Sequence, residues 1–132
     1  MEASGYGYVV SLSGVSPEEA KNRVVEALAA EGFGVLTEID VKATLKKKLD
    51  VDFRPYVILG ACNPKLAHRA LSVEPAIGLL LPCNVVVEAT DDGARISLVN
   101  PRAMFEVVKN TALNEVVKDA DARLRRVAEA LS

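Results

Sequence analysis

Residues 79–99 read LLLPCNVVVEATDDGARISLV and carry the strongest indication of the fold class. Leu79 to Thr90 predicts one β-strand and Ala94 to Val99 predicts the next. Between them, Asp91-Asp92-Gly93 is typical of a tight hairpin turn. Because a short turn can join only antiparallel neighbours, this pair argues against a purely parallel sheet.

Three elements are expected at the start of the chain, followed by a short helix. Residues 6–12 alternate large apolar with smaller residues, which predicts a strand with one covered face. Residues 16–19, Ser-Pro-Glu-Glu, form a capping box with proline at the first helical position. Gly32 is placed to end that helix in a left-handed conformation. Residues 33–41 alternate again as a second strand, and residues 41–49 have the i, i+4 apolar spacing of a short helix.

The remaining elements surround the hairpin. Residues 55–62 are apolar on both faces, which predicts a strand inside the sheet. Asn63-Pro64 can cap and open a helix that Glu74-Pro75 stops. After the hairpin, Asn100-Pro101 starts another helix, and an apolar stripe over residues 111–131 predicts a long amphipathic helix.

This order of elements predicts a two-layer α+β fold, with a largely antiparallel sheet of about five strands and helices packed on one face. The alternation of strands and helices at the start also fits a doubly wound parallel sheet, which is the alternative. Residues 1–132 have the length of a single domain and contain no linker or repeat.

Composition excludes several classes of function. The formal net charge is −2, with 16 basic and 18 acidic residues, so no electrostatic footprint for nucleic acid is visible. Lys46-Lys47-Lys48 is the one basic run and is interpreted as a solvated helix face. No apolar stretch is long enough to span a membrane and the N-terminus lacks a secretory signal, so we expect a cytoplasmic protein with reduced thiols. Half of the residues are hydrophobic, which favours a second subunit.

Two Cys-Asn dipeptides are the sharpest candidates for chemistry. Cys62 immediately precedes the helix that Asn63 caps, where the helix dipole favours a thiolate. Cys83-Asn84 lies near the start of the next strand. If the two strands are antiparallel neighbours, Cys62 and Cys83 approach each other and form a two-thiol site for redox exchange, persulfide carriage or a soft metal such as Cu(I).

Other interpretations of these residues stay open. Free cysteine is among the most buried residue types, so both thiols can be simple core packing. His68, the only histidine, can partner a thiolate from its helix or stand exposed without a role. Asp40 is either a site residue or the cap of the following helix. No cofactor is predicted, and no metal site, because structural zinc needs four ligands.

Familiar catalytic motifs are absent from the sequence. No glycine-rich loop has nucleotide-binding spacing, and there is no G-x-S-x-G or H-E-x-x-H motif. Whether the protein is an enzyme is therefore left undecided.

Four blocks of sequence together resemble a known family. They are residues 31–41 (EGFGVLTEIDV), Lys48-Leu49, residues 56–64 (YVILGACNP) and residues 79–85 (LLLPCNV). The chain is similar here to the prokaryotic family called domain of unknown function 302. The resemblance implies a small α+β protein that associates as a homodimer, and it implies no activity.

Two functions follow as hypotheses. The first is a small binding or thiol-relay protein whose site contains Cys62, Asn63, Cys83, Asn84 and His68, with the asparagine amides orienting a ligand. The second is a homodimeric interaction module that binds a protein partner through apolar surface, with purely structural cysteines. An enzyme with Asp40 or His68 as acid or base is third.

Overall fold

A computed structural model of the chain describes all of residues 1–132 and contains one six-stranded antiparallel sheet in the order β1-β2-β6-β5-β4-β3. The strands are β1 (Glu2–Ala3), β2 (Gly7–Ser13), β3 (Gly34–Asp40), β4 (Tyr56–Cys62), β5 (Cys83–Ala89) and β6 (Gly93–Val99). The helices are α1 (Pro17–Ala30), α2 (Val41–Leu49), α3 (Pro64–Val73), α4 (Pro101–Met104) and α5 (Asn114–Leu131). Two 3₁₀ segments, η1 (Pro75–Leu80) and η2 (Thr111–Leu113), complete the chain.

The predicted α+β fold is confirmed, and the doubly wound alternative is wrong because every strand pair is antiparallel. The sheet has one strand more than the five expected, because Glu2–Ala3 adds a short edge strand to β2. The predicted start of the fourth strand at Leu79 is also wrong. Pro75–Leu80 forms a 3₁₀ segment, so β5 begins at Cys83. An apolar run alone does not distinguish these two conformations.

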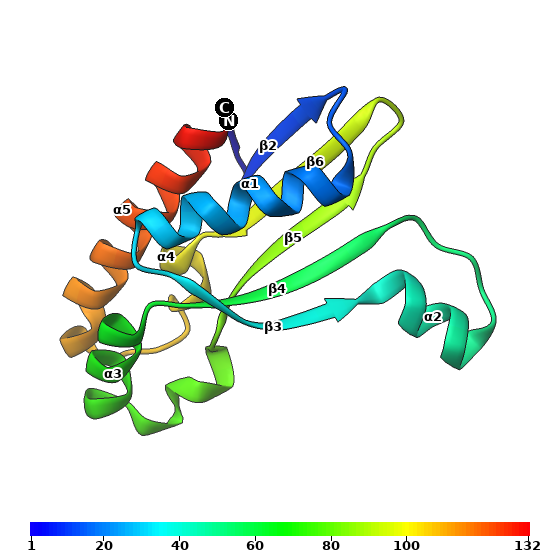
Figure 1. Ribbon diagram of the computed structural model, residues 1–132. Helices are drawn as coiled ribbons and strands as arrows, with labels where there is room; N and C mark the ends of the chain where they lie inside the picture. Colours follow the sequence, from blue (N-terminus) through cyan, green and yellow to red (C-terminus); the bar gives the residue numbers. More distant parts are fainter.

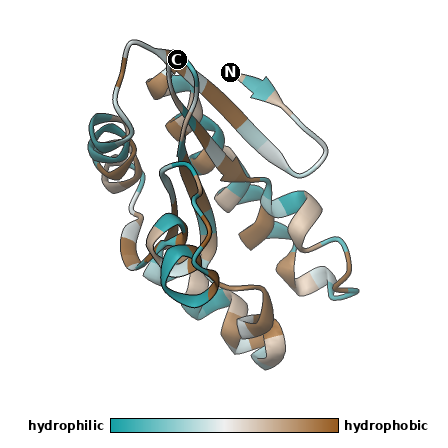
Figure 2. Cartoon of the chain, turned by 90° about the vertical axis from the view of Figure 1, so that its right-hand side faces the viewer, coloured by the Kyte–Doolittle hydropathy of each residue, from teal (hydrophilic) through white to brown (hydrophobic).

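Helices α1 and α5 cover one face of the sheet and form the main core with it (Figure 1). Alternate residues of each strand point into this core, as Leu59, Val85 and Ile96 do on three neighbouring strands. Hydrophobic and hydrophilic residues follow one another along the helices (Figure 2), as expected for elements with one covered side. The core therefore lies on a single face of the sheet.

The ends of α1 are set by its sequence. Ser16 Oγ accepts a hydrogen bond of 3.1 Å from the backbone N–H of Glu19, which confirms the predicted N-cap. The second hydrogen bond of a capping box, from the backbone N–H of Ser16 to the Glu19 carboxylate, is not formed. That carboxylate instead accepts a hydrogen bond of 2.9 Å from Arg23. Gly32 has φ +84°, a left-handed conformation that favours glycine, and turns the chain into β3.

A second, smaller apolar cluster lies beyond the end of the sheet. It joins α3, η1, the residue after α4, η2 and the first half of α5, with Leu66, Ile77, Phe105 and Leu113 among its buried members. This cluster lies beside the end of β4, so the sheet and these helices meet in a corner there.

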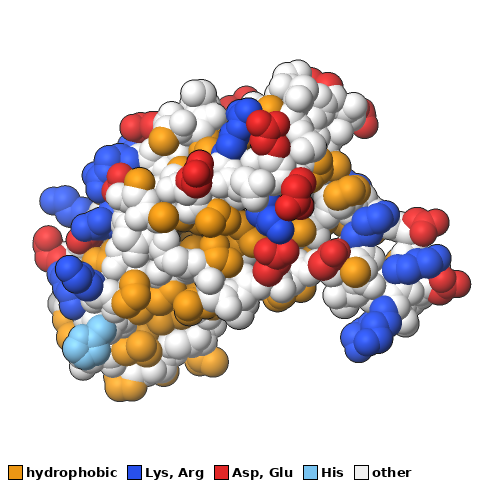
Figure 3. Space-filling model, in the orientation of Figure 1, with side chains coloured by type: hydrophobic (Ala, Val, Ile, Leu, Met, Phe, Trp, Pro, Cys, Tyr) orange, Lys and Arg blue, Asp and Glu red, His pale blue; other side chains and the backbone are white.

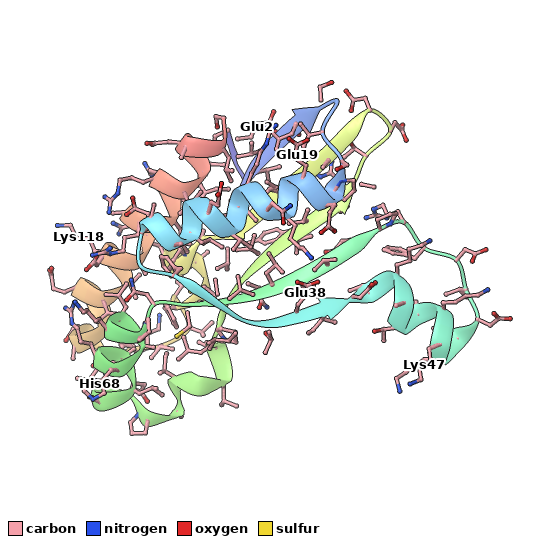
Figure 4. The ribbon with its side chains drawn as sticks, in the orientation of Figure 1. Glu2, Glu19, Glu38, Lys47, His68 and Lys118 are labelled. Atoms are coloured by element: carbon pink, nitrogen blue, oxygen red, sulfur yellow. The ribbon has the colours of Figure 1, made fainter.

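Helix α2 stands apart from the rest of the molecule (Figure 1). None of its residues is buried, and Lys47 points into open surroundings (Figure 4). Lys46 pairs with Asp50 at 2.8 Å, so the basic run lies on an exposed helix as expected. No helix of the protein combines the length and the apolar character that crossing a bilayer demands.

Candidate functional site

A pocket of about 260 Å³ lies at the corner where the ends of β4 and β5 meet α3 and α5. Of the fifteen residues that line it, thirteen are hydrophobic. Helix α3 contributes Leu66, Ala67, Ala70 and Leu71, and α5 contributes Val116 and Ala120. Such a lining is typical of a site that binds apolar groups.

The chain forms this corner by a direct passage from strand to helix. Cys62 is the last residue of β4, Asn63 caps α3, and Pro64 is the first residue of that helix. Proline suits this position because it has no N–H to leave unsatisfied and its φ is already helical. The short connection places the end of β4 and the first turns of α3 on the same pocket wall.

Asn63 is the only polar side chain that lines the pocket apart from the thiols, and it is buried. Its Oδ1 accepts a hydrogen bond from the backbone N–H of Leu66, and its Nδ2 donates one to the carbonyl of Glu31, each at 3.3 Å. Both ends of the amide are thus engaged with the backbone. The role that these bonds indicate for Asn63 is to fix the start of α3, not to bind a ligand.

The two thiols line the same pocket from different positions in the sheet. Strands β4 and β5 are antiparallel neighbours, as predicted, but Ala61 is the residue directly opposite Cys83. Because side chains alternate along a strand, the Cys62 side chain leaves the backbone on the face of the sheet opposite to that of Ala61 and Cys83. Both cysteines are free thiols, Cys83 buried and Cys62 half-buried.

The environment of Cys83 disfavours its ionised form. Burial, with a smaller contribution from nearby Cys62, raises the pKa of the Cys83 thiol to about 11. Only the thiolate is a strong nucleophile, so Cys83 is a neutral, apolar lining group at physiological pH.

The other candidates lie outside the pocket. His68 is exposed on α3 and points outward from the molecule (Figure 4). Asp40 caps α2, accepting from the backbone N–H of Ala43 at 2.9 Å, and pairs with Val57 at the far end of β4 from Cys62. Asn84 is exposed and is not part of the lining. The structure thus gathers Cys62, Asn63 and Cys83, and no group of three metal-ligating side chains occurs.

Exposed apolar side chains surround the pocket. Leu36, at an irregularity in the pairing of β3 with β4, is 68% exposed, and Leu71 on α3 is 41% exposed; both also line the pocket. Hydrophobic side chains gather over α3 and η1 at this end of the molecule (Figure 3). The apolar surface therefore continues from the inside of the pocket to its outside.

Sequence reasoning missed a buried polar cluster on the opposite side of the core. Asp121 of α5 accepts hydrogen bonds from the Tyr8 hydroxyl and, at 2.9 Å, from Arg102 Nε. Arg125 donates to the Tyr8 hydroxyl at 3.3 Å. One feature of the sequence could have revealed this cluster. Asp121 is an acidic residue within the apolar stripe of α5, three residues before Leu124. The cluster ties β2, α4 and α5 together.

A second missed group lies on the face of the sheet that α1 and α5 leave uncovered. Glu88 of β5 is buried and accepts from Arg54 Nε at 2.9 Å and from Arg95 Nε at 3.4 Å. Burial alone would raise the pKa of Glu88, but the hydrogen bonds and charges of the two arginines outweigh it and hold the pKa below its ordinary value.

Comparison with known proteins identifies a family and solved structures that are closely similar. A family model described as "Domain of unknown function DUF302" matches residues 8–131. The crystal structure of an uncharacterized conserved DUF302 protein from Bacillus stearothermophilus is 32% identical and has a TM-score of 0.86. The match covers 96% of this chain and 98% of that one. No curated protein matches the sequence.

Proposed function

Because the chain belongs to the DUF302 family, which is defined without a function, we propose one from its own geometry: the protein binds a small apolar ligand in the pocket between β4, β5, α3 and α5. The observation that carries this proposal is the lining, in which thirteen of fifteen residues are hydrophobic and the one amide is already hydrogen-bonded. With no free polar group to orient a charged substrate, burial of apolar surface is the available source of affinity.

The size of the pocket limits the ligand. An apolar protein cavity of roughly 150 Å³ accepts benzene. A volume of about 260 Å³ therefore suits a two-ring hydrocarbon or a short branched chain. A longer ligand can extend out of the pocket and pack its apolar tail against the exposed side chains of Leu36 and Leu71.

Thiol relay is less well supported than binding. Relay through both sulfurs needs a thiolate at Cys83, and the pKa of about 11 makes that form rare near neutral pH. In the binding proposal, Cys62 and Cys83 act as apolar lining groups. Replacing Cys62 with serine should therefore leave ligand binding in place, whereas a relay would lose its half-exposed thiol.

Titration with naphthalene, followed by amide chemical shifts, tests the proposal. We expect saturable shift changes confined to residues of α3, the end of β4 and the first half of α5. The variant Ala67→Phe adds a ring on a pocket-lining position and should abolish binding. The matched control Ala29→Phe places the same ring on the exposed side of α1 and should bind as the wild type does.

Two results would overturn the proposal. One is a wild-type protein whose pocket amides do not respond to naphthalene. The other is binding that survives in Ala67→Phe while that variant keeps the wild-type fold by circular dichroism, because the ligand would then lie elsewhere.

A further inference from the structure

A second hollow, of about 440 Å³, lies between α3 and α5 next to the apolar pocket. Asn63 and Leu66 line both spaces, and both side chains are buried. The two spaces are therefore neighbours that share part of one wall. Their linings differ in character, because four of the eight residues around the second hollow are charged. We refer to this second space as the basic hollow.

Positive charge is in excess around the basic hollow. Its charged residues are Lys65, Arg69, Arg123 and a single acid, Asp119. The Asp119 carboxylate accepts a hydrogen bond of 2.8 Å from Arg123 Nε and lies 3.9 Å from Arg69 Nη1, so one negative charge is shared by two guanidinium groups. Lys65 is exposed and forms no ion pair. Because the whole chain has a net charge of −2, this local excess is not a result of overall composition.

Helix α3 presents alternate side chains to the two spaces. Ala67 and Ala70 line the apolar pocket, Lys65 and Arg69 line the basic hollow, and Leu66 between them lines both. A molecule whose apolar part lies in the pocket against Leu66 can thus extend a polar group toward the cations. A short flexible link between the two parts is sufficient, since only the edge of one side chain has to be crossed.

From this adjacency we infer that the ligand is an amphiphilic anion, with its apolar part in the pocket and a carboxylate or phosphate ester in the basic hollow. The inference rests on the proposed function and adds the chemical class of the head group. Inside the pocket no free polar group can pair with a charge, so the charge lies beyond the shared wall. Guanidinium groups match the planar or forked oxygens of carboxylates and phosphates, which favours these two head groups.

Isothermal titration calorimetry with a matched pair of compounds tests the inference. 2-Naphthylacetate and 2-naphthylacetamide have the same ring and nearly the same shape, but only the first is charged at pH 7. The acetate should bind the wild type about tenfold more tightly, and added NaCl should reduce this preference because the cations are near the surface. 2-Naphthyl phosphate identifies the head group: tighter binding than the acetate assigns a phosphate ester, and weaker binding assigns a carboxylate.

Variants of the basic hollow locate the charge recognition. Arg69→Gln removes one exposed cation and should weaken acetate binding by about five- to tenfold while leaving acetamide binding unchanged. Lys65→Gln should act in the same direction and provides a second, independent test. The matched control is Lys118→Gln on α5, because Lys118 is exposed, lines neither space and points outward from the molecule (Figure 4). Its affinity for both compounds should equal that of the wild type.

Two results would overturn this inference and leave the apolar pocket proposal in place. One is equal affinity of the wild type for the acetate and the acetamide, with naphthalene still bound. The other is a preference for the acetate that persists in both Arg69→Gln and Lys65→Gln, because the charge would then be recognised elsewhere. Failure of naphthalene and both of its derivatives to bind would instead remove the pocket proposal, and this inference with it.

Discussion

Ala61, and not Cys62, lies directly opposite Cys83 in the antiparallel pairing of β4 and β5. The two thiols therefore border one pocket without forming a cross-strand pair. They also differ in exposure, since Cys83 is buried and Cys62 is half-buried. This difference makes the cysteines separable by experiment.

We expect only one thiol of the native protein to react quickly with Ellman's reagent. At pH 8 a thiol with a pKa of about 11 is ionised in roughly one molecule in a thousand. Cys62 should react first, and Cys83 only after unfolding in denaturant. The Cys62→Ser variant should show almost no rapid phase, and two equal rates in the wild type would contradict this account.

The raised pKa of Cys83 should make stability depend on alkaline pH. Between an ordinary value near 9.0 and about 11, the folded protein retains a proton that the unfolded chain has lost. Stability is therefore full below the lower value and falls as pH rises through the higher one, by roughly 2–3 kcal/mol. Urea denaturation at a series of pH values measures this loss.

Cys83→Val is the control for that experiment, because it removes the titrating group and keeps an apolar side chain. The pKa of Tyr8 is also raised, by burial and then by its hydrogen bond to Asp121, but Tyr8 is present in both proteins. The difference between the two stability curves therefore reports Cys83. Parallel curves over this range would show that the thiol ionises freely.

Asp121→Ala should destabilise the protein by roughly 2–3 kcal/mol, because the buried Tyr8 hydroxyl loses its main partner and Arg102 loses its carboxylate. Asp119→Ala is the matched control on the same helix. Asp119 is partly exposed and pairs with Arg123 at 2.8 Å, so its loss should cost about 0.5 kcal/mol. Thermal denaturation compares the two, and equal losses would remove any special role from the Tyr8 cluster.

Gly60→Ala should destabilise the protein by roughly 1–3 kcal/mol through overpacking. A Cβ at this position would stand 2.8 Å from Cγ of Pro82 and would also collide with the Thr37 hydroxyl. The Thr37 side chain can rotate, but the proline ring cannot. The double variant Thr37→Ala, Gly60→Ala should therefore recover little stability in chemical denaturation, and full recovery would assign the clash to Thr37 alone.

Local signals in the sequence were sufficient for most of the fold. The caps at Ser16, Asn63 and Asn100 all form the expected hydrogen bonds, because a side chain three residues or fewer from its target needs no long-range information. The hairpin after β5 likewise fixed the antiparallel direction of the sheet. The 3₁₀ segment at Pro75–Leu80 was not predictable, since its apolar residues are selected by packing in the smaller cluster.

The candidate site was predictable in location but less so in composition. Strand ends brought Cys62 and Cys83 to one pocket, yet the sequence could not reveal that α3 and α5 line it with apolar residues. His68 was misleading because successive positions on a helix point in different directions. Ala67 lines the pocket, whereas His68 faces solvent. Asp121 and Tyr8 were missed because they are 113 positions apart in the chain, and only the folded structure brings them together.

The separate position of α2 has a consequence for how this protein can change. Asp40 and Val57 are paired neighbours, so the two ends of the β3–β4 connection lie side by side at the edge of the sheet. Residues 41–52 of this connection can be exchanged without touching the core, because α2 contributes no buried residue and the three residues after it are exposed. A tight turn, a longer insertion or a whole fused module fits at this point. The corner with α2 is thus where new specificity can be added by evolution or by engineering while the scaffold stays the same.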